Sequence, residues 1–265
     1  YEKEKPVKPS EPVRPVKPSE PVRPVKPAEK KVEYQLWKRK TRDNTLTDES
    51  TFLDWYRKDV RFMNKFFIID GDENFNFNPD NLLTDLEVFK MLAVAFNADI
   101  VKGERISETS NWYDKYISAL NYSETLRGPK IQETSSSSEP TLRMYFVSFL
   151  ERTYEDIKAP DFGFTDVGHL KYKGKNELEA YNAINNLASI GVLKGYGNGL
   201  AGPEDTVTRA QAAALIYRAM DNKGLVEQFE KEAKDGVWIR KGDKINGCEI
   251  NTDLWELVET EMRTR

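Results

Sequence analysis

The sequence predicts a mainly α-helical domain of three helix-loop-helix copies, preceded by an extended proline-rich segment. Proline recurs at every third position near the N-terminus, and a later segment recurs in three copies with the same internal spacing. Apolar residues repeat at helical intervals within each copy. Because a pair of short helices cannot bury its own apolar faces, we expect the three copies to pack together with approximate threefold symmetry.

The N-terminal segment has proline at every third position from Pro6 to Pro27, in repeats of the form PVKPSEPVR. Polyproline II has three residues per turn, so these prolines share one edge and the charged side chains face water. Such a segment cannot build a core, and we predict that residues 1–31 form a semi-rigid spacer. The same periodicity suits a ligand of an SH3-like groove, but any proline spacer of this kind has it.

The three copies follow the spacer. The first and third align without a gap, so that Thr84 falls on Thr208, and a weaker middle copy places Thr141 at the same position. In each copy a glycine lies 13 residues before the threonine, at positions 71, 128 and 195. This shared spacing divides the chain into residues 45–100, 108–157 and 161–222.

Each copy is expected to contain a first helix, a polar loop and a second helix that begins at the threonine. Thr84 with Glu87, and Thr208 with Gln211, match the T-x-x-E/Q capping box. The middle copy keeps Thr141 but lacks an acid or amide at the third helical position, so its second helix should have the weakest start. The expected core consists of apolar residues at helical spacing: Val60, Met63, Phe89, Leu92, Phe96, Ile117, Leu120, Phe146, Leu150, Tyr181, Ile184, Leu187, Ala213, Ile216 and Met220.

Composition excludes several classes of function. The net charge of −4 and a pI near 5.4, without a basic tract outside the spacer, argue against a nucleic-acid binder. No apolar run is long enough for a membrane span. With Cys248 and His169 as the only residues of their kinds, and no paired-carboxylate motif, we expect no enzyme and no cofactor. The chain begins at Tyr1 without an apolar leader, which suggests a mature or excised piece of a longer protein.

The stretch DGDENFNFNPDN raises the question of calcium, because oxygen-bearing residues alternate as in a calcium loop: Asp70, Asp72, Asn74, Asn76 and Asn78. However, Phe75 stands where the turn needs glycine, and Asn81 stands where a bidentate glutamate is required. We therefore interpret the stretch as the inter-helix loop of the first copy and predict no metal site.

The third copy resembles an S-layer homology repeat. The resemblance covers an opening Phe-x-Asp-Val, a helix that ends in Gly-Val, a Gly-Tyr-x-x-Gly turn, and Thr-Arg-Ala before the second helix, with these matching residues: Phe164, Asp166, Val167, Ala183, Ile184, Leu187, Gly191, Gly195, Tyr196, Gly199, Pro203, Thr208, Arg209 and Ala210. Gln211 replaces the usual acid. The first copy matches moderately, and the middle copy is recognisable mainly by its spacing.

The resemblance implies a three-pronged helical domain that attaches an exported protein to the cell wall or S-layer. Its implied partner is a secondary cell-wall polysaccharide that bears a pyruvate ketal, bound non-covalently, and other cell-surface or S-layer proteins are further candidate partners. A degenerate domain could instead serve as a structural or protein-interaction module without binding polysaccharide. The residues that the resemblance implicates in polysaccharide binding are Arg209, Gly195, Tyr196, Asn198, Gly199, Asp166, Thr208 and Gln211.

Arg209 is the strongest candidate among these residues. It occupies the first helical position, where the helix dipole disfavours a cation, and a pyruvyl carboxylate bound by the arginine and by free backbone donors would reverse this balance. The alternative is an ion pair with Glu204 or Asp205. Because the alignment places Asp85 and Leu142 at the same position of the other copies, we expect the site of Arg209 to be the principal one.

Residues 223–265 lie outside the resemblance, and the sequence assigns them no role. We expect a helix at VEQFEKEA, a hairpin around the Lys-Gly-Asp or Asn-Gly turn of GVWIRKGDKINGCEI, and a further helix at TDLWELVETEM.

Overall fold

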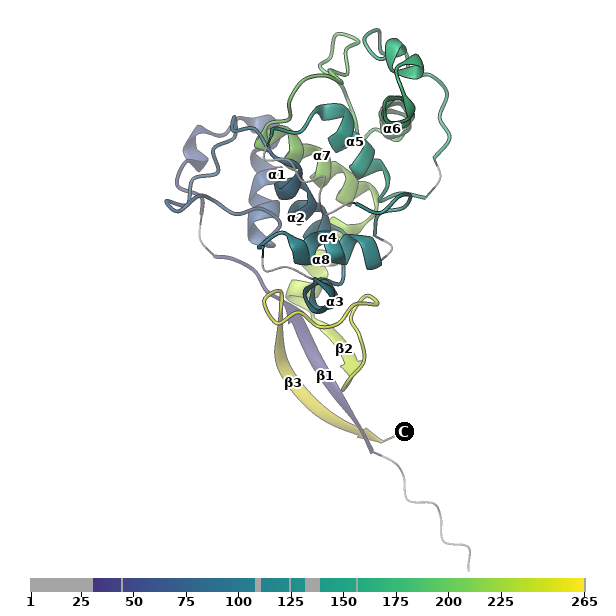
Figure 1. Cartoon of the computed structure of the whole chain (residues 1–265). Coiled ribbons are helices and arrows are strands. Elements are labelled where there is room, and N and C mark those ends of the chain that lie inside the picture. The colour runs from purple at the N-terminus through teal and green to yellow at the C-terminus, as the bar shows by residue number, and fades with distance from the viewer. Residues whose placement is uncertain are drawn as a thin grey trace, which may run out of the picture.

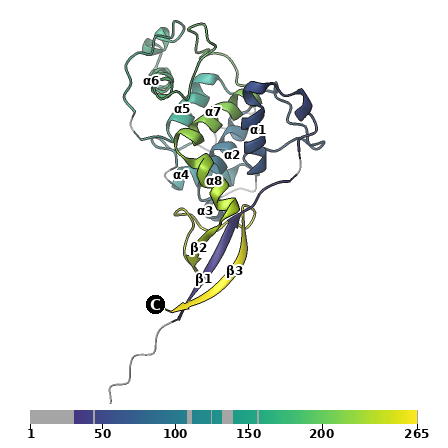
Figure 2. The same cartoon turned by 180° about the vertical axis from the view of Figure 1, so that it is seen from behind.

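The computed structural model describes residues 31–264 except residues 44, 108–110, 124, 132–138 and 156. The predicted spacer therefore lies almost entirely outside the described residues. The described chain forms a helical body with a three-stranded sheet projecting from one end (Figure 1). The view from behind shows α8 at the junction between the helical body and the sheet (Figure 2). The predicted mainly α-helical class is confirmed.

The second helix of each copy lies at the centre of the body. These helices are α2 (Asp85–Ala95), α5 (Arg143–Glu151) and α7 (Arg209–Asn222), and α2 contacts both of the others. The first helices are α1 (Asp54–Lys65), α4 (Asp114–Tyr122) and α6 (Lys175–Ser189). Each first helix packs against the second helix of another copy: α1 on α7, α4 on α2, and α6 on α5. The six helices therefore bury their apolar faces against one another in these pairs.

Three antiparallel bridges connect the segments that precede the central helices. They pair Leu82 with Thr208, Thr84 with Pro140, and Leu142 with Thr206. In each bridge, the N-cap residue of one central helix pairs with the residue that lies two positions before the N-cap of another central helix. The bridges thus join the three segments into a closed ring.

Helix capping agrees with the sequence in two copies and differs in the third. Thr84 and Thr208 form the predicted capping boxes with Glu87 and Gln211. The middle helix begins one residue later than predicted, with Leu142 at the N-cap position and no side-chain cap. Our alignment of the middle copy at its threonine was therefore wrong by one residue.

Two further helices complete the body. Helix α3 (Ile100–Ile106) packs against α4, and α8 (Leu225–Lys234) connects α7 to the sheet. The predicted helix at VEQFEKEA is confirmed by α8. Single-turn 3-10 helices occur at Glu49–Thr51 and Gly168–Tyr172.

The sheet has the order β2-β1-β3 and consists of β1 (Lys31–Arg39), β2 (Val237–Arg240) and β3 (Trp255–Thr264), all antiparallel. The helix that we predicted at TDLWELVETEM is wrong, because most of this segment lies in β3. Pairing with β1 along nearly its whole length satisfies the backbone groups of β3 that face β1, and a register shift beside Leu36 places one additional residue in β3. The predicted Asn-Gly turn occurs at Asn246 and Gly247, both with positive φ, between the bridged residues Ile245 and Cys248.

Candidate functional site

Two arginines at the first positions of central helices make the same contact with different loops. The Nε of Arg209 donates to the carbonyl oxygen of Phe77, and the Nε of Arg143 donates to that of Ala201, both at 2.8 Å. Phe77 and Ala201 occupy equivalent places in the loops of the first and third copies. Each arginine therefore reaches into the loop of another copy rather than into its own.

Arg143 corrects our prediction that Leu142 occupies the position of Arg209. Because α5 begins one residue later, the middle copy also has an arginine there. Arg143 is buried, and its guanidinium lies 5.1 Å from the ring centre of Tyr196. Asp85 holds this position in the first copy, and burial raises the pKa of its carboxyl.

The first backbone donors of α7 are already engaged. The N–H of Arg209 donates to the carbonyl oxygen of Asn81 at 2.8 Å, and that of Ala210 donates to Pro79 at 3.0 Å. The next donor is engaged by the capping box. Our expectation that free donors at this helix end would receive a ligand carboxylate is therefore wrong, because the loop of the first copy supplies the acceptors.

The alternative partners of Arg209 are also engaged elsewhere. Glu204 pairs with a lysine that follows the 3-10 helix of the third copy, and Asp205 accepts a hydrogen bond from the hydroxyl of Tyr196 at 2.9 Å. Arg209 instead approaches Glu87, with 3.8 Å between Nη1 and Oε1. Burial lowers the pKa of Arg209, and Glu87 opposes this effect.

A pocket of about 520 Å³ has Arg209 in its lining. The loop of the first copy and α2 form one wall, and the segment that begins α4 forms the other. Its aromatic lining includes Trp112, whose side chain is 53% exposed, and Tyr116. Lys90 and Lys115 add cationic groups to the lining. Acidic side chains line the same hollow, so that Asp70, Asp72 and Glu87 balance the charges of Lys90, Lys115 and Arg209. Exposed aromatic faces beside charged groups suit a polar ligand that has apolar faces.

Charges at the base of the pocket are partly neutralised. Asp70 lies between Lys90 and Arg42 and forms ion pairs with both. These two cations lower the pKa of Asp70 against the opposing effect of its burial. Lys115 has no ion pair within the described ranges, and its amine lies 5.4 Å from the ring centre of Tyr116.

The alternating acids and amides of the first loop hold the loop itself. Asp72 accepts hydrogen bonds from the backbone N–H groups of Asn74 and Asn76, at 2.8 and 2.9 Å, and from the side chain of Asn78 at 2.9 Å. These donors lower the pKa of Asp72 to about 2. Among the described residues, no group of three or more acidic, histidine or cysteine side chains could hold a metal ion.

The predicted binding residues divide between two places. Thr208 and Gln211 cap α7 next to Arg209. The others belong to the loop of the third copy, which contacts Arg143 and not Arg209: Asp166, Gly195, Tyr196, Asn198 and Gly199. The predicted binding residues therefore fall into two groups, one next to Arg209 and one next to Arg143.

In the third loop, several predicted residues maintain the backbone conformation. Asp166 accepts hydrogen bonds from the N–H groups of Ala201 and Gly202, as Asp48 does in the first loop. Asn198 accepts a hydrogen bond from the N–H of Leu200 at 3.3 Å. Gly195 has φ 64°, and a Cβ there would lie 2.7 Å from the ring of Phe164.

Sequence reasoning missed Arg143 and the residues that α4 contributes to the pocket. The arginine could have been found by placing the helix start at Leu142, since the sequence Leu-Arg then aligns with Thr-Arg. Trp112 and Tyr116 belong to the middle copy, whose loop is the most divergent. No sequence signal joins them to Arg209, because the contact depends on the packing of α4 against α2.

Comparison with known proteins finds a family match within the third copy. Residues 175–213 match the S-layer homology domain. The chain is 22% identical over 178 residues to an amylopullulanase of Thermoanaerobacterium thermosulfurigenes, covering 64% of this chain and 9% of that protein. It is also 22% identical over 173 residues to the exoglucanase XynX of Acetivibrio thermocellus, covering 63% of this chain and 16% of that protein. The chain thus spans less than a fifth of the length of these relatives.

The fold and the matched segment define an anchoring domain of the cell surface. Residues 175–213 form an S-layer homology domain, which confirms the resemblance predicted from the third copy. Such domains anchor proteins at the cell wall or S-layer, typically through cell-wall polysaccharide, and are not catalytic. In the part of the chain that the structure describes, every helix is too short or too polar to cross a membrane.

Proposed function

We propose that this chain anchors a larger protein to the cell surface by binding pyruvylated secondary cell-wall polysaccharide in the pocket beside Arg209. The observation that carries the proposal is that Trp112, Tyr116, Lys115 and Arg209 line one open pocket together. The chain itself performs no catalysis in this proposal, and its relatives' enzymatic names refer to proteins of which it matches only a small part.

The ligand chemistry follows from the lining. A pyranose ring has apolar C–H faces that pack on exposed aromatic rings such as Trp112. A pyruvate ketal adds a carboxylate, which an amine or guanidinium binds by charge-assisted hydrogen bonds. Lys115 supplies such an amine, and Arg209 supplies a guanidinium whose Nε and Nη2 donate to the carbonyl oxygens of Phe77 and Asp70 while Nη1 approaches Glu87. We assign recognition of the carboxylate to these two cations.

The anchoring domain in this proposal consists of three S-layer homology copies, of which only one offers this site. The ring of bridges and the matching contacts of Arg143 and Arg209 support the three copies. The third-copy loop lies against Arg143, which is buried, whereas Asp85 replaces the arginine that would reach the middle loop. In this proposal the exposed pocket beside Arg209 is the principal site.

Calorimetric titration with purified wall polysaccharide tests the proposal. We expect the parent to bind pyruvylated polymer, with loss of most of the heat after chemical removal of the pyruvate. Lys115→Gln and Trp112→Ala should each weaken binding by about tenfold or more, equivalent to about 1.4 kcal/mol. The matched controls are Lys234→Gln and Tyr172→Ala, two exposed residues outside the pocket.

The alternative function predicts a different result. If the parent produces no heat with either polymer, the domain serves as a structural or protein-interaction module of the surface. Equal binding before and after removal of the pyruvate would contradict the assigned role of Arg209 and Lys115.

A further inference from the structure

Residues 223–265 lie outside the S-layer homology match, and the structure brings part of them to the sugar-binding pocket proposed above. A second hollow, of about 360 Å³, adjoins that pocket. The two hollows share four lining residues: Asp70, Lys90, Lys115 and Tyr116. We propose that the C-terminal extension lengthens the groove into a second subsite, so that the domain binds an acidic oligosaccharide of more than one repeating unit.

The second hollow has the chemistry required for such a ligand. Its cationic lining consists of Lys40, Arg42, Lys90 and Lys115, and its acids are Asp70 and Asp253. Four cations therefore face two carboxylates, which leaves an excess of positive charge along the groove. Tyr116 continues the aromatic lining from the first hollow. Apolar side chains, Val94, Ile100 and Leu254, complete the floor.

The extension is held firmly at this position. The backbone N–H of Lys40 donates to the carbonyl oxygen of Leu254 at 2.9 Å, and its amine donates to the carbonyl oxygen of Thr252 at 2.7 Å. Asn251 closes the turn by accepting hydrogen bonds from the N–H groups of Leu254 and Trp255. The wall that bears Asp253 is thus preorganised, which lowers the entropic cost of binding.

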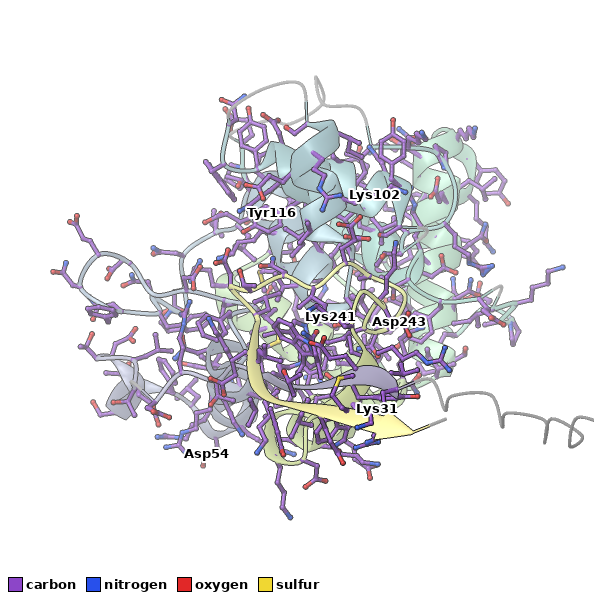
Figure 3. The ribbon with its side chains drawn as sticks, turned by 90° about the horizontal axis from the view of Figure 1, so that it is seen from below. Lys31, Asp54, Lys102, Tyr116, Lys241 and Asp243 are labelled. Atoms are coloured by element: carbon purple, nitrogen blue, oxygen red, sulfur yellow. The ribbon has the colours of Figure 1, made fainter. Side chains whose placement is uncertain are left out.

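A buried ion pair joins β1 to α8 of the extension, next in sequence to Lys40 of the second hollow. Arg39 donates through Nε to Glu232 of α8 at 2.7 Å, and both side chains are almost completely buried. The guanidinium lies 3.6 Å from the ring centre of Phe229 and 4.6 Å from that of Trp255. Lys40 follows Arg39, and Leu254 precedes Trp255. The stack therefore fixes the positions of these two lining residues at one end of the second hollow. Figure 3 shows the C-terminal segment (yellow) crossing beneath the helical body that bears Tyr116.

The inference rests on the proposed function, but it predicts a dependence on ligand length that the first pocket alone would not produce. A fragment of one repeating unit fills the pocket beside Arg209, whereas a longer fragment continues past Lys115 and Tyr116 toward Lys40. Affinity should therefore rise by about tenfold between fragments of one and three pyruvylated repeating units, beyond the statistical gain from additional units.

Two opposite substitutions test the second subsite in the full chain. Lys40→Gln removes a cation and should weaken binding of the three-unit fragment by about threefold to tenfold, while binding of the one-unit fragment stays unchanged. Asp253→Asn removes a repelling carboxylate and should strengthen binding of the three-unit fragment only. Lys38→Gln, two residues away on β1 and outside both hollows, is the matched control. Thermal unfolding of each variant checks that the fold is retained.

The outcomes separate this inference from the proposed function. If the one-unit fragment binds but neither Lys40→Gln nor Asp253→Asn changes the affinity for the three-unit fragment relative to the control, the second subsite is wrong and the first stands. If both variants change the two fragments equally, the effect is general electrostatics and the second subsite is again wrong. If neither fragment binds the parent, both proposals fail.

Discussion

Arg143 and Arg209 occupy the first positions of α5 and α7, and each donates its Nε to a loop carbonyl of another copy at the same distance of 2.8 Å. Their surroundings nevertheless differ. Arg143 lies beneath Tyr196 and is buried, whereas the side chain of Arg209 keeps 17% of its surface exposed beside the pocket. The same contact therefore holds the copies together at both places, and we assign ligand binding to Arg209 alone.

Arg143→Ala should lower the free energy of unfolding by about 2–4 kcal/mol, because it removes a buried charged hydrogen bond and leaves the carbonyl of Ala201 without its donor. Binding of wall polysaccharide by the folded fraction should stay unchanged. Chemical denaturation and calorimetry measure the two effects. A loss of affinity without a loss of stability would show that the loop contacted by Arg143 is also part of a binding site.

The capping box of α7 should contribute about 1 kcal/mol to stability. Thr208→Ala removes the oxygen that accepts from the N–H of Gln211, so we expect a loss of that size in chemical denaturation. Thr208→Ser keeps the oxygen and should retain most of the stability. Equal losses in both variants would indicate that the threonine methyl group, and not the cap, provides the stabilisation.

The pH dependence of stability should contain a contribution from Asp59. Burial in the helical body raises the pKa of this carboxyl from 3.8 to about 6, although Arg218 and Lys58 oppose the shift. Between these two pH values the native state binds more protons than the unfolded state, so this contribution to stability falls as pH rises from about 4 to about 6. Asp59→Asn should remove that part of the slope. Unfolding free energies of parent and variant at pH 4, 5, 6 and 7 provide the comparison, and parallel curves would contradict the assigned shift.

The ion pair between Arg39 and Glu232 should control the attachment of the sheet. Glu232→Ala leaves a buried guanidinium without its carboxylate, and we expect a loss of about 3–5 kcal/mol. Hydrogen exchange should increase along β1 and β3 more than in α2. The double variant Arg39→Met with Glu232→Leu removes both charges and should recover much of the stability. If exchange increases equally throughout the chain, the pair stabilises the whole fold and not the attachment of the sheet specifically.

Sequence patterns predicted the elements whose signals are local. The capping threonines with Glu87 and Gln211 identified the starts of α2 and α7, and the third copy identified the S-layer homology domain. The middle copy was misaligned by one residue because its threonine is present but does not cap the helix. The strand β3 was predicted as a helix because its sequence is also compatible with helical periodicity, and only pairing with the distant β1 favours the extended conformation.

The sequence by itself determined the capping of two central helices and the family of the third copy, because these depend on residues close together in the chain. Only the tertiary structure decided that Arg209 contacts the loop of the first copy and that Trp112 and Tyr116 line the same pocket as Arg209. It also decided that the extension lines the adjoining hollow. The physical reason is that each helix buries its apolar face against another copy, so the groove forms between segments whose separation in sequence carries no local signal.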